Sequence, residues 1–288
     1  MGCPCEIQLY TDDKAAAEHI AQIAIVDIRR LEARYSRYRK DSLLSEINRV
    51  AANKGKINVD EETAALLNYA DTCFQQSDGL FDITSGILRR VWRFDDNRLP
   101  AQRLIDNLLA KVGWDKVQWQ PPSLDFTLPE MELDFGGIVK EYAADRAATL
   151  CIEAGAECGI INLGGDIKII GPRPDNQPWR IGISAPGTES APLQAINLTH
   201  GAVASSGDYE RYLLIDGKRY GHVLNPKTGW PVRHLSAVTV ISDFCVVAGS
   251  ASTIAMLKEE QGPDWLTSMG LPHFWMDEHG NQHNRLNA

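Results

Sequence analysis

Residues 133–140 read Leu-Asp-Phe-Gly-Gly-Ile-Val-Lys, the end of an expected strand that runs through two glycines into a helix. Apolar residues then recur at the spacing of one helix face, and Gly155 stands where such a helix would stop. That face comprises Val139, Ala143, Ala147, Leu150 and Ala154. The stretch therefore predicts a strand, a tight turn and a helix over residues 138–154, and the rest of the fold is predicted outward from it.

The turn itself has two interpretations. Glycines let a ligand approach the backbone, and the free N–H groups of a helix start attract anions. Lys140 lies in the first turn, where the helix dipole disfavours a cation unless an anion such as a phosphate lies beside it. The alternative is an ordinary strand–turn–helix with a solvated lysine, and this segment alone does not separate the two.

Composition narrows the class of protein. The chain has 288 residues, of which 44% are hydrophobic and 23% charged, which is typical of a globular protein with an ample core. Its formal net charge of −9 argues against a nucleic-acid partner, because phosphate backbones require clustered Lys and Arg. No apolar run approaches the roughly 20 residues that a membrane-spanning helix needs. We expect neither a nucleic-acid surface nor a membrane span.

The N-terminus and the cysteines bear on the compartment. No basic region followed by an apolar core is visible, so the sequence as it stands predicts a cytoplasmic protein, and a periplasmic one if an export segment has been removed. The first strand is expected over Pro4–Tyr10. The six cysteines show no metal-ligand spacing and are expected to be reduced, which fits the cytoplasmic alternative.

The remaining periodicities predict an α+β protein in which helices flank mostly antiparallel sheet. Helices are expected at 13–35, 61–76, 101–112, 138–154 and 244–258. In the first, one apolar stripe comprises Ile20, Ala24, Ile28, Leu31 and Tyr35. Strands are expected at 159–163, 167–170, 179–184, 193–198, 202–205, 211–215, 220–224 and 237–242, with Asp216-Gly217 as the clearest hairpin turn. No linker or repeat is apparent. We expect residues 1–288 to form a single unit of two interlocked lobes, with residues 89–130 as a peripheral excursion.

Several clusters combine small residues, a turn and a carboxylate or histidine. They are Tyr35-Ser-Arg-Tyr-Arg-Lys-Asp-Ser42, Asp78-Gly-Leu-Phe-Asp82, Asn162-Leu-Gly-Gly-Asp166, Ser205-Ser-Gly-Asp-Tyr209 and His222-Val-Leu-Asn-Pro-Lys-Thr-Gly229. Each also has a structural explanation. Gly164-Gly165 could only make a turn, Asp82 could cap a helix through Thr84, and Asn225-Pro226 could start a type I turn.

Taken together, in this order, and with the 133–140 stretch, these motifs resemble the FAD:protein FMN transferase family, also called the ApbE family. The resemblance covers Met1 to about Leu257. It implies a Mg²⁺-dependent enzyme that cleaves the pyrophosphate of FAD, transfers FMN to a Thr or Ser hydroxyl of an acceptor protein and releases AMP. Acceptors in the family are flavoprotein subunits of respiratory and redox complexes.

The resemblance also implies site residues. The residues expected at the FAD site are Met1, Tyr38, Leu80, Phe81, Asp82, Asp134, Lys140 and His222. His222 is the candidate catalytic residue, because a histidine there can take the proton of the acceptor hydroxyl. The main-chain oxygen of Gly137 and the side chain of Thr253 are the expected metal ligands, since a hard cation prefers oxygen.

One departure weakens the metal prediction. Where the family has the metal-binding aspartate of an Ala-Asp-Ala-x-x-Thr pattern, this chain has Gly249, which offers no side-chain ligand. Asn225 and Glu141 also differ from the residues common in the family. The small residues from Gly249 to Ser252 would alternatively serve close packing against a strand. Three hypotheses therefore stand: an FMN transferase, an FAD-binding protein with little catalysis, and an FAD pyrophosphatase that yields FMN and AMP.

Overall fold

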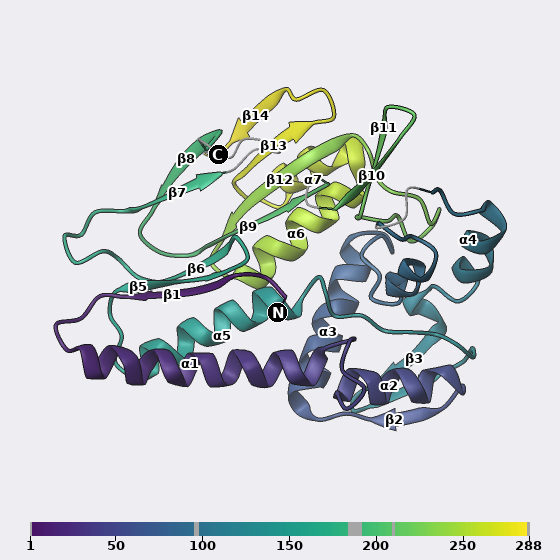
Figure 1. The fold of residues 1–288 in the computed structure, drawn as a ribbon, viewed down its shortest axis with the longest axis horizontal. Helices are drawn as coiled ribbons and strands as arrows, with labels where there is room; N and C mark the ends of the chain where they lie inside the picture. The colour runs from purple at the N-terminus through teal and green to yellow at the C-terminus, as the bar shows by residue number, and fades with distance from the viewer. Residues whose placement is uncertain (1, 95–97, 184–191, 209–210, 287–288) are drawn as a thin grey trace.

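The computed structural model describes residues 2–94, 98–183, 192–208 and 211–286, and its centre is a seven-stranded antiparallel sheet. The strand order is β1-β5-β6-β9-β12-β13-β14 (Figure 1). The bounds are β1 Cys5–Leu9, β5 Gly159–Leu163, β6 Asp166–Gly171, β9 Ala202–Gly207, β12 Leu235–Ser242, β13 His273–Asp277 and β14 Gln282–Arg285. With its flanking helices this sheet confirms the predicted α+β class.

Smaller sheets and the helices complete the chain. The three-stranded sheet has the order β2-β4-β3, with bounds Lys56–Asn58, Ser123–Phe126 and Val117–Gln120. Two hairpins form separate two-stranded sheets, β7 Trp179–Ile183 with β8 Gln194–Leu198, and β10 Tyr212–Ile215 with β11 Lys218–Gly221. The α-helices are α1 Lys14–Tyr35, α2 Leu43–Ala52, α3 Glu61–Gln76, α4 Gln102–Leu109, α5 Val139–Glu153, α6 Cys245–Leu257 and α7 Gly262–Ser268. Short 3₁₀ turns occupy Ser85–Arg90, Trp114–Lys116 and Glu259–Gln261.

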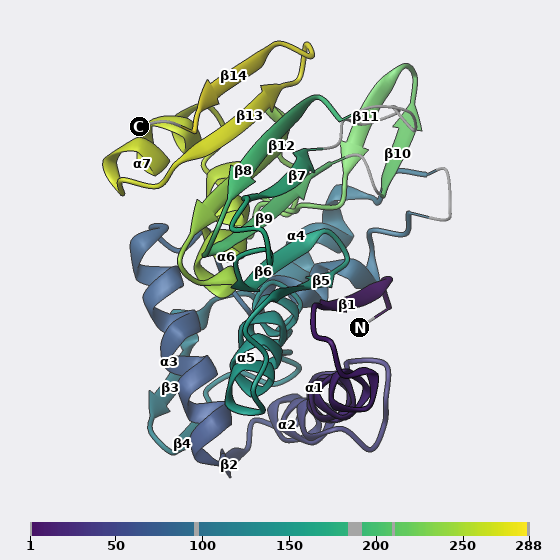
Figure 2. The same cartoon turned by 90° about the vertical axis from the view of Figure 1, so that its left-hand side faces the viewer.

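Helices α5 and α6 cover one face of the seven-stranded sheet, and α1 packs on the outer side of α5 (Figures 1 and 2). Both covering helices are built from small residues on their buried sides. On α5 these are Ala143, Ala144, Ala147 and Ala148, and on α6 they are Ala248, Gly249, Ser250, Ala251 and Ser252. Small side chains let helix axes approach closely, so α5 and α6 form a tight seam beneath the sheet. None of the helices in the described ranges combines the length and apolar composition needed to cross a membrane.

Local sequence signals account for several elements as predicted. Asp13 Oδ1 accepts the Ala15 N–H at 2.8 Å and caps α1, whose buried side follows the predicted apolar stripe. Helix α5 ends one residue before Ala154, and Gly155 follows with φ of 97°, a left-handed conformation that glycine adopts without strain. Asp216 and Gly217 both have positive φ, as a two-residue hairpin turn requires.

Other elements differ from the sequence expectations. Helix α2 was not expected, yet Leu44, Ile47 and Ala51 are fully buried and have helical spacing. The strand expected at 220–224 is β11, which ends at Gly221. The 89–130 stretch, expected to be peripheral, places Phe126 and other side chains in the main hydrophobic core, together with residues of the seven-stranded sheet. Ser184 of the expected 179–184 strand lies outside the described residues.

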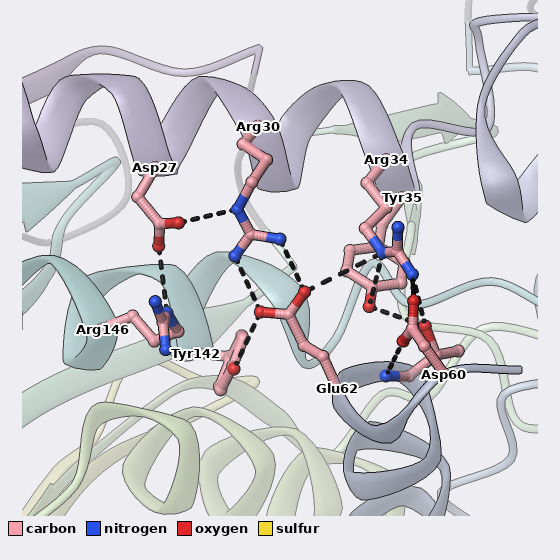
Figure 3. Close-up of polar contacts among 9 residues, drawn as sticks. Asp27, Arg30, Arg34, Tyr35, Asp60, Glu62, Tyr142 and Arg146 are labelled. Atoms are coloured by element: carbon pink, nitrogen blue, oxygen red, sulfur yellow. Dashed lines mark hydrogen bonds and ion pairs between the residues drawn. The ribbon is translucent and has the colours of Figure 1, made fainter.

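A network of charged side chains joins three helices (Figure 3). Arg30 of α1 forms a bidentate pair with Glu62 of α3, with N–O distances of 2.6 and 2.8 Å. Arg30 also contacts Asp27 at 2.7 Å, and Asp27 accepts from Arg146 of α5 at 3.0 Å. Tyr142 of α5 donates to Glu62 at 3.2 Å. Because planar bidentate pairs are stronger than single contacts, we infer that this network fixes α1 and α3 against α5.

We expect Glu62→Gln to lower the free energy of unfolding by about 1–2 kcal/mol at neutral pH, since it removes a charged acceptor shared by Arg30 and Tyr142. The matched control is Glu18→Gln. Glu18 pairs with Lys14 in a fully solvated position, 70% and 89% exposed, and should change stability by less than about 0.5 kcal/mol. Urea unfolding of both variants checks the difference.

The same pair makes stability depend on pH. Hydrogen bonds from Arg30 lower the pKa of Glu62 below its ordinary value of 4.5, in spite of partial burial. A lowered folded-state pKa adds stability above the unfolded value, and this stability is lost as pH falls through the folded value. The gap between the wild type and Glu62→Gln should therefore narrow below pH 4.5. A gap that stays constant down to acid pH would contradict this assignment.

Candidate functional site

A cavity of about 1080 Å³ opens at the N-terminal end of α5. Its size is at the upper end for ligand pockets and suits a ligand as large as a dinucleotide. Nine of the residues predicted from sequence line it, namely Tyr38, Leu80, Phe81, Asp82, Asp134, Gly137, Lys140, His222 and Thr253. Gly249 does not line the cavity, and Met1 lies outside the described residues. Residues from distant parts of the sequence thus converge, while their individual roles stay predictions.

Two aromatic side chains give the cavity flat apolar surfaces. Tyr38 is 77% exposed, although Arg37 lies 5.0 Å from its ring centre and donates to its hydroxyl at 2.8 Å. Phe81 is buried beside Gly137, where an added Cβ would lie 3.3 Å from its ring. An exposed tyrosine at the rim and a buried phenylalanine beneath it can contact both faces or edges of a planar ligand.

Asp82 is largely satisfied inside the protein. Its Oδ1 accepts from the N–H and the hydroxyl of Thr84, at 2.7 and 2.6 Å, and its Oδ2 accepts the Trp114 N–H at 3.0 Å. Burial raises the pKa of this carboxyl, while the three donors oppose that effect. Asp82 therefore bonds to Thr84, as the structural explanation expected, but it does not cap a helix, since the 3₁₀ turn at Ser85–Arg90 has no side-chain cap bond. Its Oδ2 alone has lone-pair capacity left for a ligand.

Asp134 is held by its surroundings at the start of the α5 turn. It forms an ion pair with Arg37 and accepts the Gly136 N–H at 2.9 Å. A Cβ added at Gly86 would lie 2.5 Å from the Asp134 Cβ, so only glycine permits this approach. The Arg37 pair neutralises Asp134 and places a guanidinium at the cavity wall.

Lys140 is paired with Asp166, the last residue of the Asn162–Asp166 motif, which was not among the predicted site residues. Its Nζ lies 2.6 Å from Asp166 Oδ2 and 3.8 Å from Glu141 Oε1. Burial alone would lower the pKa of Lys140, and the two carboxylates instead raise it above its ordinary value. Asp166 comes from the tight turn after β5, where Gly164 and Gly165 both have positive φ. The turn is thus structural and also delivers a site residue.

Glu141 occupies the seam between α5 and α6. A Cβ added at Gly249 would lie 2.5 Å from Glu141 Cγ and 3.1 Å from its Oε1, so the glutamate fills the space above that glycine. Burial, with a further contribution from Asp166, raises the pKa of Glu141 to about 8. Glu141 Oε2 is buried and has no hydrogen-bond partner among the described residues. Such an atom is costly unless a proton or a cation compensates it.

The oxygen groups near this carboxylate fit a hard divalent cation. Thr253 lies one helical turn after Gly249 on α6, and Glu141 one turn after Gly137. All except Gly249 line the cavity. Within the described residues, no three His, Cys, Asp or Glu side chains converge into a dedicated metal cage. A cation held by one or two carboxylates and by ligand phosphates is the mode typical of Mg²⁺.

His222 follows β11 directly and is exposed at the cavity wall. Its neighbour Asp208 is buried, which raises the pKa of that carboxyl, and the charges of Arg219 and His222 act in the opposite direction. Asn225 closes the following turn, with Oδ1 accepting the Lys227 N–H at 2.9 Å. Asn225 therefore has a structural role in this turn, and His222 remains positioned to reach a ligand.

The fold is similar to that of flavin transferases of known structure. The ApbE protein of Thermotoga maritima superposes with a TM-score of 0.88 at 32% identity, covering 98% of this chain and 94% of that one. The flavinyl transferase ApbE of Pseudomonas stutzeri gives a TM-score of 0.86 at 28% identity, covering 98% and 90%.

Sequence comparison gives the family directly. The model of the ApbE family matches residues 1–275, and the chain belongs to this family. The FAD:protein FMN transferase of Klebsiella pneumoniae is 32% identical over 248 residues, covering 84% of this chain and 75% of that protein. The protein of the same name in Haemophilus influenzae is 30% identical over 258 residues, covering 85% and 75%.

The bonding of Asp82 yields a stability prediction. We expect Asp82→Ala to lower the free energy of unfolding by about 2–4 kcal/mol without any flavin present. The substitution leaves the buried donors of Thr84 and Trp114 without their acceptor. Asp115→Ala, at an exposed neighbouring position, should change stability by less than about 0.5 kcal/mol. Denaturant unfolding of the flavin-free variants checks both. An Asp82→Ala variant as stable as the control would show that the carboxylate is not structural.

Proposed function

We propose that this chain is an FAD:protein FMN transferase, which transfers the FMN half of FAD to a hydroxyl of an acceptor protein and releases AMP. The observation that carries the proposal is the convergence of nine sequence-predicted residues on one cavity, in a chain of the ApbE family. The related proteins named above bear the name of this activity.

The cavity has groups suited to both parts of FAD. Tyr38 and Phe81 offer aromatic surfaces to the isoalloxazine or adenine ring. Lys140 and the guanidinium of Arg37 provide positive charge for the pyrophosphate. Because a lysine is a point charge and an arginine a planar donor, the two together can bind phosphate oxygens with different geometries.

The reaction forms one bond and breaks one. The acceptor hydroxyl oxygen attacks the phosphorus of the FMN half, a new phosphoester bond forms, and the P–O bond to AMP breaks with its electron pair. His222 takes the proton of the attacking hydroxyl, and the AMP phosphate leaves as an anion. Lys140 stabilises the charge that develops on the phosphate oxygens.

Magnesium is the proposed metal, with the Gly137 carbonyl and the Thr253 hydroxyl among its ligands. When bound, a hard cation supplies positive charge to the phosphate oxygens. The support for this proposal is the unpartnered carboxylate oxygen of Glu141 in the same cavity and the hydroxyl and carbonyl beside it. The acceptor is proposed to be a flavoprotein subunit of a redox complex, in which a Thr or Ser hydroxyl receives the FMN.

A single assay separates the three candidate functions. The purified chain is incubated with FAD, Mg²⁺ and a Thr-bearing flavoprotein domain, and covalent flavin is detected by in-gel fluorescence together with released AMP. We expect both products from a transferase. Free FMN with AMP and no labelled acceptor would assign a pyrophosphatase. Bound FAD with neither product would leave an FAD-binding protein, and the absence of FAD binding would overturn the proposal.

For the catalytic role we expect His222→Gln to reduce the rate of FMN transfer by about 10²–10⁴-fold, the range typical of losing a general base. FAD affinity should stay within a few-fold of the wild type, since the base acts on the acceptor proton. His19→Gln, at an exposed position on α1, is the matched control and should leave the rate unchanged. Equal loss of FAD affinity and rate in His222→Gln would instead indicate a binding role.

A further inference from the structure

We propose that Glu141 of α5 is the carboxylate ligand of the divalent cation, and that it reaches across the α5–α6 seam into the space that a side chain at position 249 of α6 would fill. The inference deepens the proposed function and rests on it only for the cation's role in catalysis. The binding of a cation by Glu141 can be measured by itself.

The Glu141 carboxylate is buried but incompletely hydrogen-bonded. The side chain is more than nine-tenths buried, yet it lines the cavity and leaves Oε2 without a hydrogen-bond partner among the described residues. A buried carboxylate retained without a donor for one of its oxygens is expected to have a further partner. A cation that enters from the cavity would be such a partner.

The charged groups around Glu141 also favour a cation at this point. Glu141 and Asp166 lie side by side, and Lys140 compensates mainly Asp166, with Nζ–O distances of 2.6 Å to Asp166 and 3.8 Å to Glu141. One lysine therefore faces two carboxylates in a buried setting. A divalent cation beside Glu141 would add the positive charge that Lys140, which lies closer to Asp166, does not supply there.

Two further oxygen groups near Glu141 can serve as ligands of a cation. The hydrogen bonds at the start of α5 run from the N–H groups of Ile138 and Val139 to Phe135, and from Tyr142 to Ile138. Among the described residues these backbone bonds leave the Gly137 carbonyl without a donor. The Thr253 hydroxyl lies at hydrogen-bond distance from Ser206, 2.9 Å, and also lines the cavity. A carboxylate, a carbonyl and a hydroxyl are oxygen ligands that a hard cation accepts, with phosphates and water completing the set.

The side chain of Glu141 occupies the space that a side chain at position 249 would need. Because an added Cβ at Gly249 would lie 2.5 Å from Glu141 Cγ and 3.0 Å from Cδ, a side chain at 249 requires the Glu141 side chain to leave its present position. A carboxylate can therefore be presented to the same point either from α5 or from α6, but not from both. This predicts that the ligand can be moved from one helix to the other by a paired substitution.

The test measures Mn²⁺ binding to the full chain by calorimetry, without FAD, with Mn²⁺ as the probe. We expect Glu141→Gln to weaken Mn²⁺ binding by at least about tenfold, since even groups that only support a metal ligand cost this much. Glu153→Gln, at an exposed position near the end of the same helix, is the matched control and should bind like the wild type. Thermal unfolding verifies that both variants are folded.

A double variant that moves the carboxylate from α5 to α6 makes the test specific. Glu141→Ala combined with Gly249→Asp should restore Mn²⁺ affinity to within a few-fold of the wild type, whereas Gly249→Asp alone should not improve it, because the two side chains collide. A structural role of Glu141 would not be rescued by a carboxylate on the other helix.

Two results would overturn the inference: Glu141→Gln with wild-type Mn²⁺ affinity, or a wild-type chain that binds no Mn²⁺. Failure of the proposed function is recognised separately, by flavin fluorescence titration in the presence of a chelator. If FAD does not bind, the transferase assignment fails, while the Mn²⁺ series still decides whether Glu141 is a cation ligand.

Discussion

The close contact of α5 with α6 is the constraint on which the site depends. Alanines on α5 and a run of alanine, glycine and serine on α6 let the two helices meet beneath the sheet. The seam leaves room for one side chain at its open end, and Glu141 takes it. Because α5 starts at the cavity, the same contact fixes where the turn before the helix presents Asp134, Gly137 and Lys140. The first two turns of α5 therefore take part both in the contact with α6 and in the cavity.

The elements that the sequence predicted well are those whose signals are local. The stripe of α1, the glycine after α5 and the Asp216-Gly217 turn each depend on a few neighbouring residues, and each has the expected conformation. The fold class followed from the succession of such elements. Helix α2 was missed although Leu44, Ile47 and Ala51 have helical spacing. The periodicity of the apolar residues was the better guide.

Long-range contacts set the limit for the site. The motifs supplied residues that now line one cavity, but no spacing within them could show that Lys140 pairs with Asp166 or that Arg37 pairs with Asp134. Asp82 illustrates a related limit. Its sequence context allowed both a ligand and a local bond to Thr84, but its hydrogen bond from Trp114 joins residues that are distant in sequence and could not be foreseen.

The substitutions at positions 141 and 249 gain meaning from the same reasoning. Taken singly, Gly249 removes a carboxylate that the resemblance to the family led us to expect, and Glu141 adds one to an already acidic seam. Their contact in space turns two unrelated departures into one exchange of position.

A carboxylate at position 141 in place of one at position 249 would also keep a cation beside the pyrophosphate. Lys140 and Arg37, the basic groups next to the start of α5, are both paired with carboxylates, so the positive charge that each offers to FAD is partly compensated. A chain with a net charge of −9 has little long-range attraction for an anionic substrate to offset this. A divalent cation next to the phosphates would add positive charge there, and the protein would hold it through one carboxylate at the right point. That requirement fixes the position of the carboxylate group and leaves open which helix carries it.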